Sequence, residues 1–162
     1  MKKMTEKALI DAFAGESMAH MKYMIFSEIA EEEGYKDIAR LFRAIAFAEK
    51  VHARNHLKSL KMIGKTQQNL EFAINGEKYE VEEMYPAYYA IANLQNEENA
   101  KKSIEYALKA EKIHVKLYEK AKKGEIEIYE IYICPICGYT HVGTPPEKCP
   151  VCKANKKKFK KF

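Results

Sequence analysis

Apolar residues recur at helical spacing along four long stretches of the chain, residues 5–33, 36–63, 67–94 and 97–122. In the first stretch, Phe13, Tyr23 and Phe26 fall on one stripe, which indicates an amphipathic helix with one buried face. Glycines follow the first, second and fourth stretches, as is common where helices end. We therefore predict four helices of ~26–29 residues, each about 40 Å long. Pro86, inside the third stretch, should bend that helix or end its regular hydrogen bonding.

The pattern changes after Gly124. Residues 126–133 are rich in β-branched and aromatic side chains and alternate in part between apolar and charged, which predicts a strand. The segments CPIC, TPP and CPVC that follow are rich in turn-forming residues. We predict an all-α domain over residues 1–124 and a small domain over residues 125–162.

The helical part contains an internal repeat. Residues 48–52 read AEKVH, and residues 110–114, 62 positions later, read AEKIH. Each copy falls on the second helix of a helical pair. The helical part therefore consists of two similar helical hairpins.

Acidic residues and histidines interrupt the apolar stripe in the middle of all four predicted helices. Residues three apart share a helix face, so Glu-x-x-His and Glu-x-x-Glu pairs can aim two side chains at one point. Burying several carboxylates together costs several kcal/mol per ion unless cations compensate the charge. Two glutamates from two helices plus two Glu-x-x-His pairs are the ligand set of di-iron carboxylate proteins. The candidate metal ligands are Glu16, Glu49, His52, Glu80, Glu83, Glu111 and His114.

Oxygen-rich coordination with only two imidazoles favours iron or manganese over structural zinc. His56 lies on the same face as His52 but has no counterpart in the second hairpin, so we interpret it as a core or rim residue. Tyr23 and Tyr88 flank the predicted site. They could hydrogen-bond the ligand carboxylates, or they could be ordinary core aromatics.

All four cysteines occur in two CxxC pairs, Cys134/Cys137 and Cys149/Cys152. This spacing indicates a tetrathiolate metal site, which either iron or zinc can occupy. A zinc ribbon is the alternative. The neighbouring aromatic residues and the CPxCGY motif favour iron.

Charge and hydropathy exclude other classes of protein. Charged residues make up 31% of the chain and no apolar run approaches ~18 residues, which excludes a membrane protein. The net charge of +5 is concentrated in a lysine-rich end, KANKKKFKKF, which we interpret as a solvated surface rather than a nucleic-acid site. The N-terminus lacks the apolar core of a secretion signal, so we expect a cytoplasmic protein.

The motifs together resemble the rubrerythrin family: AFAGES at 12–17, AEKVH at 48–52, EVEEMYP at 80–86, AEKIH at 110–114, and the rubredoxin-like CPICGY and CPVC. The resemblance covers essentially the whole chain. It implies a ferritin-like di-iron bundle followed by a rubredoxin-like domain.

The resemblance also implies roles for the candidate residues. Glu49 and Glu111 would bridge the irons, Glu16 would be terminal on one iron, and Glu80 with His114 would be terminal on the other. Glu83 and His52 would exchange at the first iron as its redox state changes. Tyr23 and Tyr88 would assist the ligands, and the four cysteines would hold the third iron, with zinc as a possible substitute.

The implied activity is reduction of hydrogen peroxide to water in protection against oxidative stress. Electrons would come from a rubredoxin or an NAD(P)H-dependent reductase, through the tetracysteine iron. The alternative is iron oxidation and storage, as in ferritins, although no feature of this sequence indicates a hollow shell.

The connection between the second and third helices is short. About five residues span at most ~18 Å, whereas a ferritin-like crossover must follow helices about 40 Å long. We therefore expect a homodimer or larger oligomer in which the first helical pair of one chain completes a bundle with the second pair of another.

Overall fold

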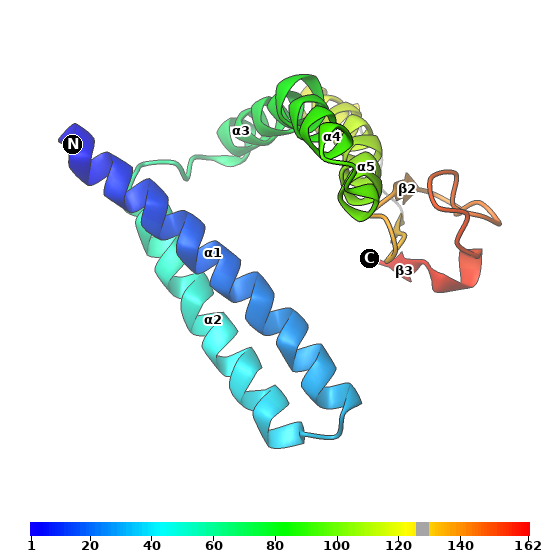
Figure 1. The fold of residues 1–162 in the computed structure, drawn as a ribbon. Coiled ribbons are helices and arrows are strands. Elements are labelled where there is room, and N and C mark those ends of the chain that lie inside the picture. The colour runs from blue at the N-terminus through cyan, green and yellow to red at the C-terminus, as the bar shows by residue number, and fades with distance from the viewer. Residues whose placement is uncertain (126–129) are drawn as a thin grey trace. The chain divides into compact units, whose positions relative to one another are not determined.

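The computed structural model describes residues 1–125 and 130–162. The chain forms two compact units, Met1–Gly64 and Lys65–Phe162, and each is described by itself (Figure 1). The division at Gly64 separates the two helical hairpins, whereas the predicted boundary near residue 124 separates the helices from the cysteine-rich segment. That second boundary stays a prediction.

The first unit is an antiparallel hairpin of α1 (Lys3–Glu32) and α2 (Lys36–Ser59) (Figure 1). Gly34 has a φ of 86°, and the N–H of Tyr35 donates to the carbonyl of Ala30 over 2.8 Å. This left-handed turn reverses the chain in three residues. Small residues lie buried between the helices and let them approach closely: Ser27, Ala30, Ala39, Ala46 and Ala53.

The second unit begins with a similar hairpin. Its first arm consists of α3 (Thr66–Tyr79), the π-helical segment η1 (Glu80–Met84) and α4 (Tyr85–Leu94); its second arm is α5 (Glu98–Lys123). Asn96 takes the left-handed conformation that Gly34 takes in the first hairpin, with a φ of 56°. The N–H of Glu97 donates to the carbonyl of Ala92 over 2.9 Å, which repeats the first turn. The four predicted helical stretches and the two-hairpin arrangement are therefore present.

The predicted irregularity at Pro86 is a π-helical turn. Pro86 lies in the first turn of α4, directly after η1, and the N–H of Tyr85 bonds to the carbonyl of Glu80, five residues back. A proline ring inside an α-helix clashes with the carbonyl four residues earlier and leaves it without a donor. The wider π turn admits one extra residue and moves that carbonyl away.

The C-terminal part of the second unit is a three-stranded antiparallel sheet beside the cysteine loops. The strands are β1 (Ile131–Ile133), β2 (Thr140–Val142) and β3 (Lys160–Lys161), in the order β2-β1-β3. A short 3₁₀ helix, η2 (Lys156–Lys158), precedes β3. β1 confirms the end of the strand predicted over residues 126–133; residues 126–129 of that prediction lie outside the described part.

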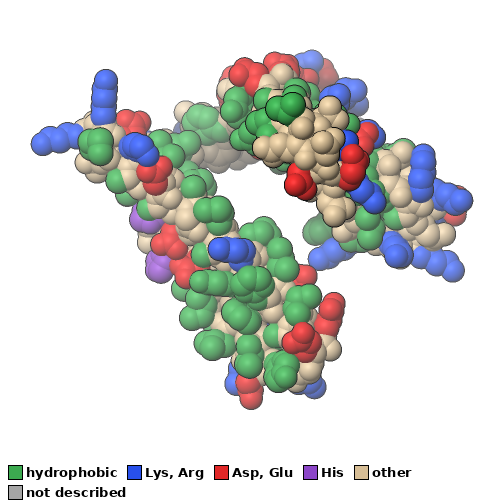
Figure 2. All heavy atoms as spheres, in the orientation of Figure 1, with side chains coloured by type: hydrophobic (Ala, Val, Ile, Leu, Met, Phe, Trp, Pro, Cys, Tyr) green, Lys and Arg blue, Asp and Glu red, His purple; other side chains and the backbone are tan. Residues whose placement is uncertain are grey.

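Both hairpins expose large apolar side chains. On the first, these include Leu41 at 60% exposure and Phe47 at 65%; on the second, Phe72 at 50% and Ile91 at 53%. Apolar side chains gather along α1 and α2 in the space-filling view (Figure 2). Pairs of helices with such faces need a further apolar partner to bury them. Among the described residues, no helix has the length and apolarity needed to cross a membrane.

Candidate metal centres

The first hairpin brings together one glutamate from α1 and a Glu-x-x-His pair from α2. Nδ1 of His52 lies 2.9 Å from Oε2 of Glu49 and 3.7 Å from Oε1 of Glu16. The ligand atoms of all three residues lie within 4.8 Å of one another. These three sequence-predicted residues therefore form one cluster, in which a single cation could contact two carboxylates and one imidazole.

The second hairpin contains an equivalent cluster of Glu77, Glu111 and His114, with ligand atoms again within 4.8 Å. Nδ1 of His114 lies 2.5 Å from Oε2 of Glu111 and 3.6 Å from Oε2 of Glu77. Both glutamate side chains are less than one fifth exposed. Oε2 of Glu77 is buried without a hydrogen-bond partner, and a buried carboxylate oxygen in that state is costly unless a cation or proton occupies the site.

The electrostatics of the second cluster show how crowded its negative charge is. Burial, and then the hydrogen bond shared with Glu111, raise the pKa of Glu77 from 4.5 to about 8. The hydrogen bond from His114 lowers the pKa of Glu111, and the same contact raises the pKa of His114. The proton shared by the two carboxyls therefore resides on Glu77, where a bound cation would replace it.

Glu80 and Glu83, the predicted ligands of this arm, are placed differently from Glu77. Glu80 is half-buried, and burial followed by the charge of Glu111 raises its pKa, so it lies close enough to take part in the site. Glu83 is exposed and belongs to none of the described clusters of possible metal ligands. The structure thus brings Glu77 to Glu111 and His114, with Glu80 nearby and Glu83 outside.

A signal for Glu77 was present in the sequence. Within the predicted helical stretches, the dipeptide Gly-Glu occurs at Gly15–Glu16 and again at Gly76–Glu77. Glu16 precedes the turn residue Gly34 by 18 positions, and Glu77 precedes the turn residue Asn96 by 19 (34 − 16 and 96 − 77). The π turn accommodates the one extra residue, so both glutamates reach the same level of their hairpins.

Tyr85, which the sequence analysis did not single out, lies close enough to the second cluster to be affected by its charge. Burial and then the charges of Glu80, Glu111 and Glu77 raise the pKa of Tyr85. Tyr88 is 47% exposed. In the first hairpin, Tyr23 packs against the rings of Phe26 and Phe42, with centroids 6.4 and 6.1 Å away.

The remaining histidines of the first hairpin lie outside its cluster. Nδ1 of His20 is 2.7 Å from the backbone carbonyl of Ala46, a contact that ties α1 to α2. His56 is half-buried and belongs to none of the described clusters of possible ligands, in keeping with its interpretation as a rim residue.

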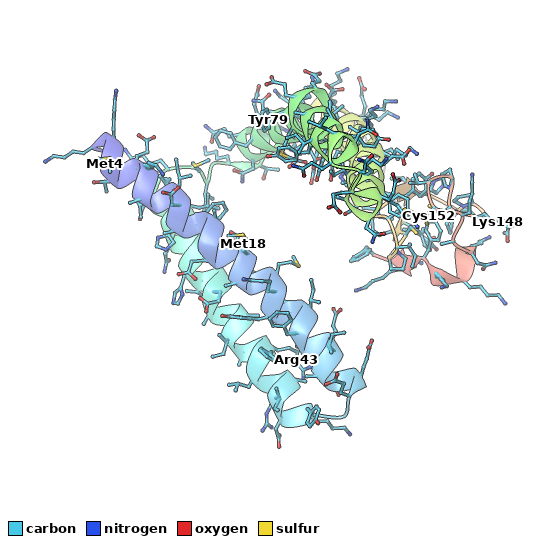
Figure 3. All side chains as sticks on the ribbon, viewed as in Figure 1. Met4, Met18, Arg43, Tyr79, Lys148 and Cys152 are labelled. Atoms are coloured by element: carbon cyan, nitrogen blue, oxygen red, sulfur yellow. The ribbon has the colours of Figure 1, made fainter. Side chains whose placement is uncertain are left out.

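The four cysteines meet in a compact cluster. Sγ of Cys134 lies 3.5 Å from Sγ of Cys152, and Sγ of Cys137 lies 3.5 Å from Sγ of Cys149. Cys152 is the least buried of the four; Figure 3 labels it together with Lys148 of the same loop region. Burial raises the pKa of the Cys134 and Cys137 thiols, as expected for a thiol without a bound metal. Four sulfurs at these separations provide a tetrahedral thiolate site.

The donor atoms fit a carboxylate-bridged iron pair and a tetrathiolate iron. Each hairpin offers two carboxylates and one imidazole. In the second set, the buried Oε2 of Glu77 has no hydrogen-bond partner, and a bound cation would supply one. One set supplies too few donors for a bridged pair, whereas both sets together supply four carboxylates and two imidazoles.

Comparisons with known proteins agree with this arrangement. A family model described as "Rubrerythrin" matches residues 7–122, and one described as "Rubrerythrin, rubredoxin-like domain" matches residues 132–160. The chain is 43% identical to Rubrerythrin-2 of Clostridium acetobutylicum, covering 98% of this chain and 97% of that protein. It is 32% identical to a rubrerythrin of Nitratidesulfovibrio vulgaris, covering 96% and 92%.

Among solved structures, the chain is similar to one described as "Fully reduced state of nigerythrin (all ferrous)". The TM-score is 0.59 at 34% identity, over 98% of this chain and 86% of that one. A second structure, the "Partially Reduced State of Nigerythrin", matches with a TM-score of 0.59 at 35% identity, with the same coverage.

Proposed function

Because the chain belongs to the rubrerythrin family, we propose that it reduces hydrogen peroxide to water, with electrons supplied through its tetracysteine iron. The family membership makes it an oxidoreductase-type di-iron protein of oxidative-stress protection, with two irons in a carboxylate site and one in the rubredoxin-like domain. The observation that carries the proposal is the pair of equivalent Glu–Glu–His clusters, one of them adjoining the tetracysteine domain.

We assign the iron ligands from the two clusters: Glu16, Glu49 and His52 from one, and Glu77, Glu111 and His114 from the other. Glu49 and Glu111, each within hydrogen-bond distance of the histidine of its own set, would hold the irons together with those histidines. We propose Glu80, in place of the predicted Glu83, as the further carboxylate that would serve the iron pair together with His52. Glu80 is half-buried beside Glu111, whereas Glu83 is exposed.

When bound, the iron pair supplies the two electrons that cleave the O–O bond, and two protons complete the conversion of H₂O₂ to two waters. The raised pKa of Tyr85 keeps its phenol protonated, so its O–H remains a donor beside three carboxylates. Donors held in place near developing oxygen charge stabilise such a step without reorganising. Tyr23 is the corresponding aromatic of the first hairpin.

A complete iron pair requires the ligands of two hairpins. The length of the connection between α2 and α3 limits whether both hairpins can come from one chain. Residues 60–65 separate α2 from α3. Six residues span roughly 20 Å, whereas a crossover along α2 would need about 36 Å. We propose that each site joins the first hairpin of one chain to the second hairpin of another, in a dimer with exchanged helix pairs.

The activity is tested by following peroxide consumption anaerobically, with NADH and a rubredoxin reductase system as the electron source. We expect stoichiometric NADH oxidation per peroxide with the iron-loaded chain. A Cys134→Ser/Cys149→Ser variant, which removes two thiolates of the tetracysteine site, should lose turnover yet keep a single round of peroxide reduction by prereduced protein. Uptake of many irons per chain without peroxide turnover would contradict the proposal.

A further inference from the structure

The cysteine-rich part of the second unit packs directly on α5, beside the Glu77–Glu111–His114 cluster. A Cβ placed on Gly138 would lie 3.7 Å from Cβ of Ala110, which shows how closely the first cysteine loop approaches the helix. Tyr106, one turn earlier on α5, packs against the buried cysteines. The helix that carries Glu111 and His114 therefore also carries the contact surface for the tetracysteine loop.

One side chain of the sheet reaches from this loop to the cluster. Oγ1 of Thr140, the first residue of β2, lies 2.7 Å from Nε2 of His114. The same hydroxyl donates to the carbonyl of Gly138 over 3.2 Å. Thr140 is only 7% exposed, so water competes little for either bond.

The order of these bonds sets the protonation of the imidazole. A carbonyl can only accept, so the single hydroxyl proton of Thr140 is directed at Gly138, and the hydroxyl oxygen accepts from His114. Nε2 of His114 must then carry a proton. Nδ1, which faces Glu111 and Glu77, shares its proton with Glu111 when no cation is bound, and it is the nitrogen at which a cation would replace that proton.

We propose that Thr140 is a positioning residue that fixes the tautomer and orientation of His114 from the tetracysteine domain of the same chain. The bonded path Cys137–Gly138–Thr140–His114 then joins the two metal-binding regions of the second unit. This proposal rests on the proposed function only in taking His114 as an iron ligand. It concerns a contact within one unit, so it holds whether or not the hairpins are exchanged between chains.

The test compares Thr140→Val, which keeps the shape and removes the hydroxyl, with Thr140→Ser, which keeps the hydroxyl. In the full-length, Zn²⁺-loaded protein, NMR should show a protected Nε2–H of His114 in wild type and Thr140→Ser. In Thr140→Val, that proton should exchange with solvent at least about tenfold faster, because its buried acceptor is gone. Thr144→Val, at an exposed threonine of the same domain, is the matched control and should behave as wild type.

Metal affinity provides a second readout. Loss of the partner of a ligating histidine costs about 10–100-fold in affinity, so Co²⁺ bound at the carboxylate–imidazole site of Thr140→Val should be displaced by correspondingly less chelator. The Co²⁺–thiolate absorption should be unchanged, which separates this effect from damage to the cysteine domain. An unaltered Nε2–H and unaltered Co²⁺ affinity in Thr140→Val would overturn the proposal while leaving peroxide reduction untouched. Conversely, a wild-type protein that shows the protected proton and binds Co²⁺ at this site, yet fails to turn over peroxide, would refute only the proposed activity.

Discussion

At the scale of single residues, the second cluster holds its carboxyl groups so close together that, without a cation, one of them retains a proton. Glu77 has one oxygen that is buried and unpartnered, and its pKa is raised to about 8 by burial and by Glu111. Its ordinary pKa of 4.5 applies in the unfolded chain. Between these values the folded protein holds a proton that the unfolded chain has released, so the metal-free fold loses stability as pH rises from about 4.5 to about 8.

We predict that Glu77→Gln has opposite effects on the metal-free and metal-loaded protein. The amide cannot ionise, so above pH 8 the metal-free variant should melt higher, by roughly 2–4 °C for each kcal/mol of repulsion removed. The same change should abolish binding of the iron pair, because it removes a carboxylate ligand.

The exposed Glu83 provides the control for this prediction. Glu83→Gln should alter neither the melting temperature across pH nor the iron content, as measured by calorimetry and metal analysis. Loss of iron in Glu83→Gln with iron retained in Glu77→Gln would show that Glu83 is the ligand, as the sequence pattern predicts.

At the scale of elements, the π turn η1 compensates for a one-residue difference in length between the first arms of the two hairpins. Their turns are equivalent, and their second arms carry the same AExxH motif 62 residues apart, but the first arm of the second hairpin is one residue longer between its glutamate and the turn. In a regular α-helix, one extra residue would rotate Glu77 by about 100° away from α5. The π turn absorbs that residue and keeps Glu77 beside Glu111 and His114.

This account predicts that one residue can be deleted from η1 without losing the cluster. A variant lacking Glu82 and carrying Pro86→Ala should form a continuous α-helix with the 18-residue spacing of the first hairpin. It should retain Co²⁺ at the carboxylate–imidazole site within about threefold, since Glu77 keeps its level and its face.

Deleting one residue from the first hairpin should have the opposite result. Removal of Lys22, which is exposed on α1, places Glu16 only 17 positions before the turn glycine and rotates Glu16 by about 100°. Co²⁺ binding should then fall to the level of a Glu16→Gln variant. Equal losses in both deletion variants would contradict the role assigned to η1.

At the scale of the whole molecule, each compact unit holds half of the donors that an iron pair requires. Both hairpins also expose large apolar residues, and under the proposed exchange each cluster would gain its missing ligands from the other kind of hairpin. The short connection at residues 60–65 favours a partner from a second chain. The tetracysteine domain, in contrast, contacts the cluster on its own α5 through Thr140.

Complementation between two inactive variants tests the exchange. Glu49→Gln disables the first cluster and Glu111→Gln the second. In a mixed dimer with exchanged hairpins, both defects fall in one site and the other site is wild type. Refolding an equimolar mixture should thus restore about a quarter of wild-type di-iron sites and activity, since half of the dimers are mixed and each has one intact site of two.

The two variants refolded separately are the controls and should remain inactive. If both hairpins of one chain surrounded the same irons, every site in the mixture would keep one defect. The absence of recovered iron pairs, despite mixed dimers verified by mass spectrometry, would therefore exclude the exchange.

Several features were determined by the sequence alone, because they are local or are repeated. Helical periodicity identified the helical stretches, the repeated AExxH motif indicated two similar hairpins, and Glu16, Glu49, His52, Glu111 and His114 were all assigned to the clusters that the structure contains. The CxxC pairs likewise predicted the tetracysteine cluster, since two cysteines of one tight loop necessarily face the same metal.

The tertiary structure decided which glutamate of the third stretch belongs to the second cluster, because the Gly-Glu repeat marks Glu77 only once the π turn is known. Glu77, Glu80 and Glu83 are each three apart, so periodicity places them along one face and leaves their level relative to α5 open. That level depends on a π turn, which arises from the fit of Pro86 and of a one-residue insertion to the packed hairpin. The contact of Thr140 with His114, 26 residues apart, depends in the same way on how the cysteine domain packs against α5, which no local pattern specifies.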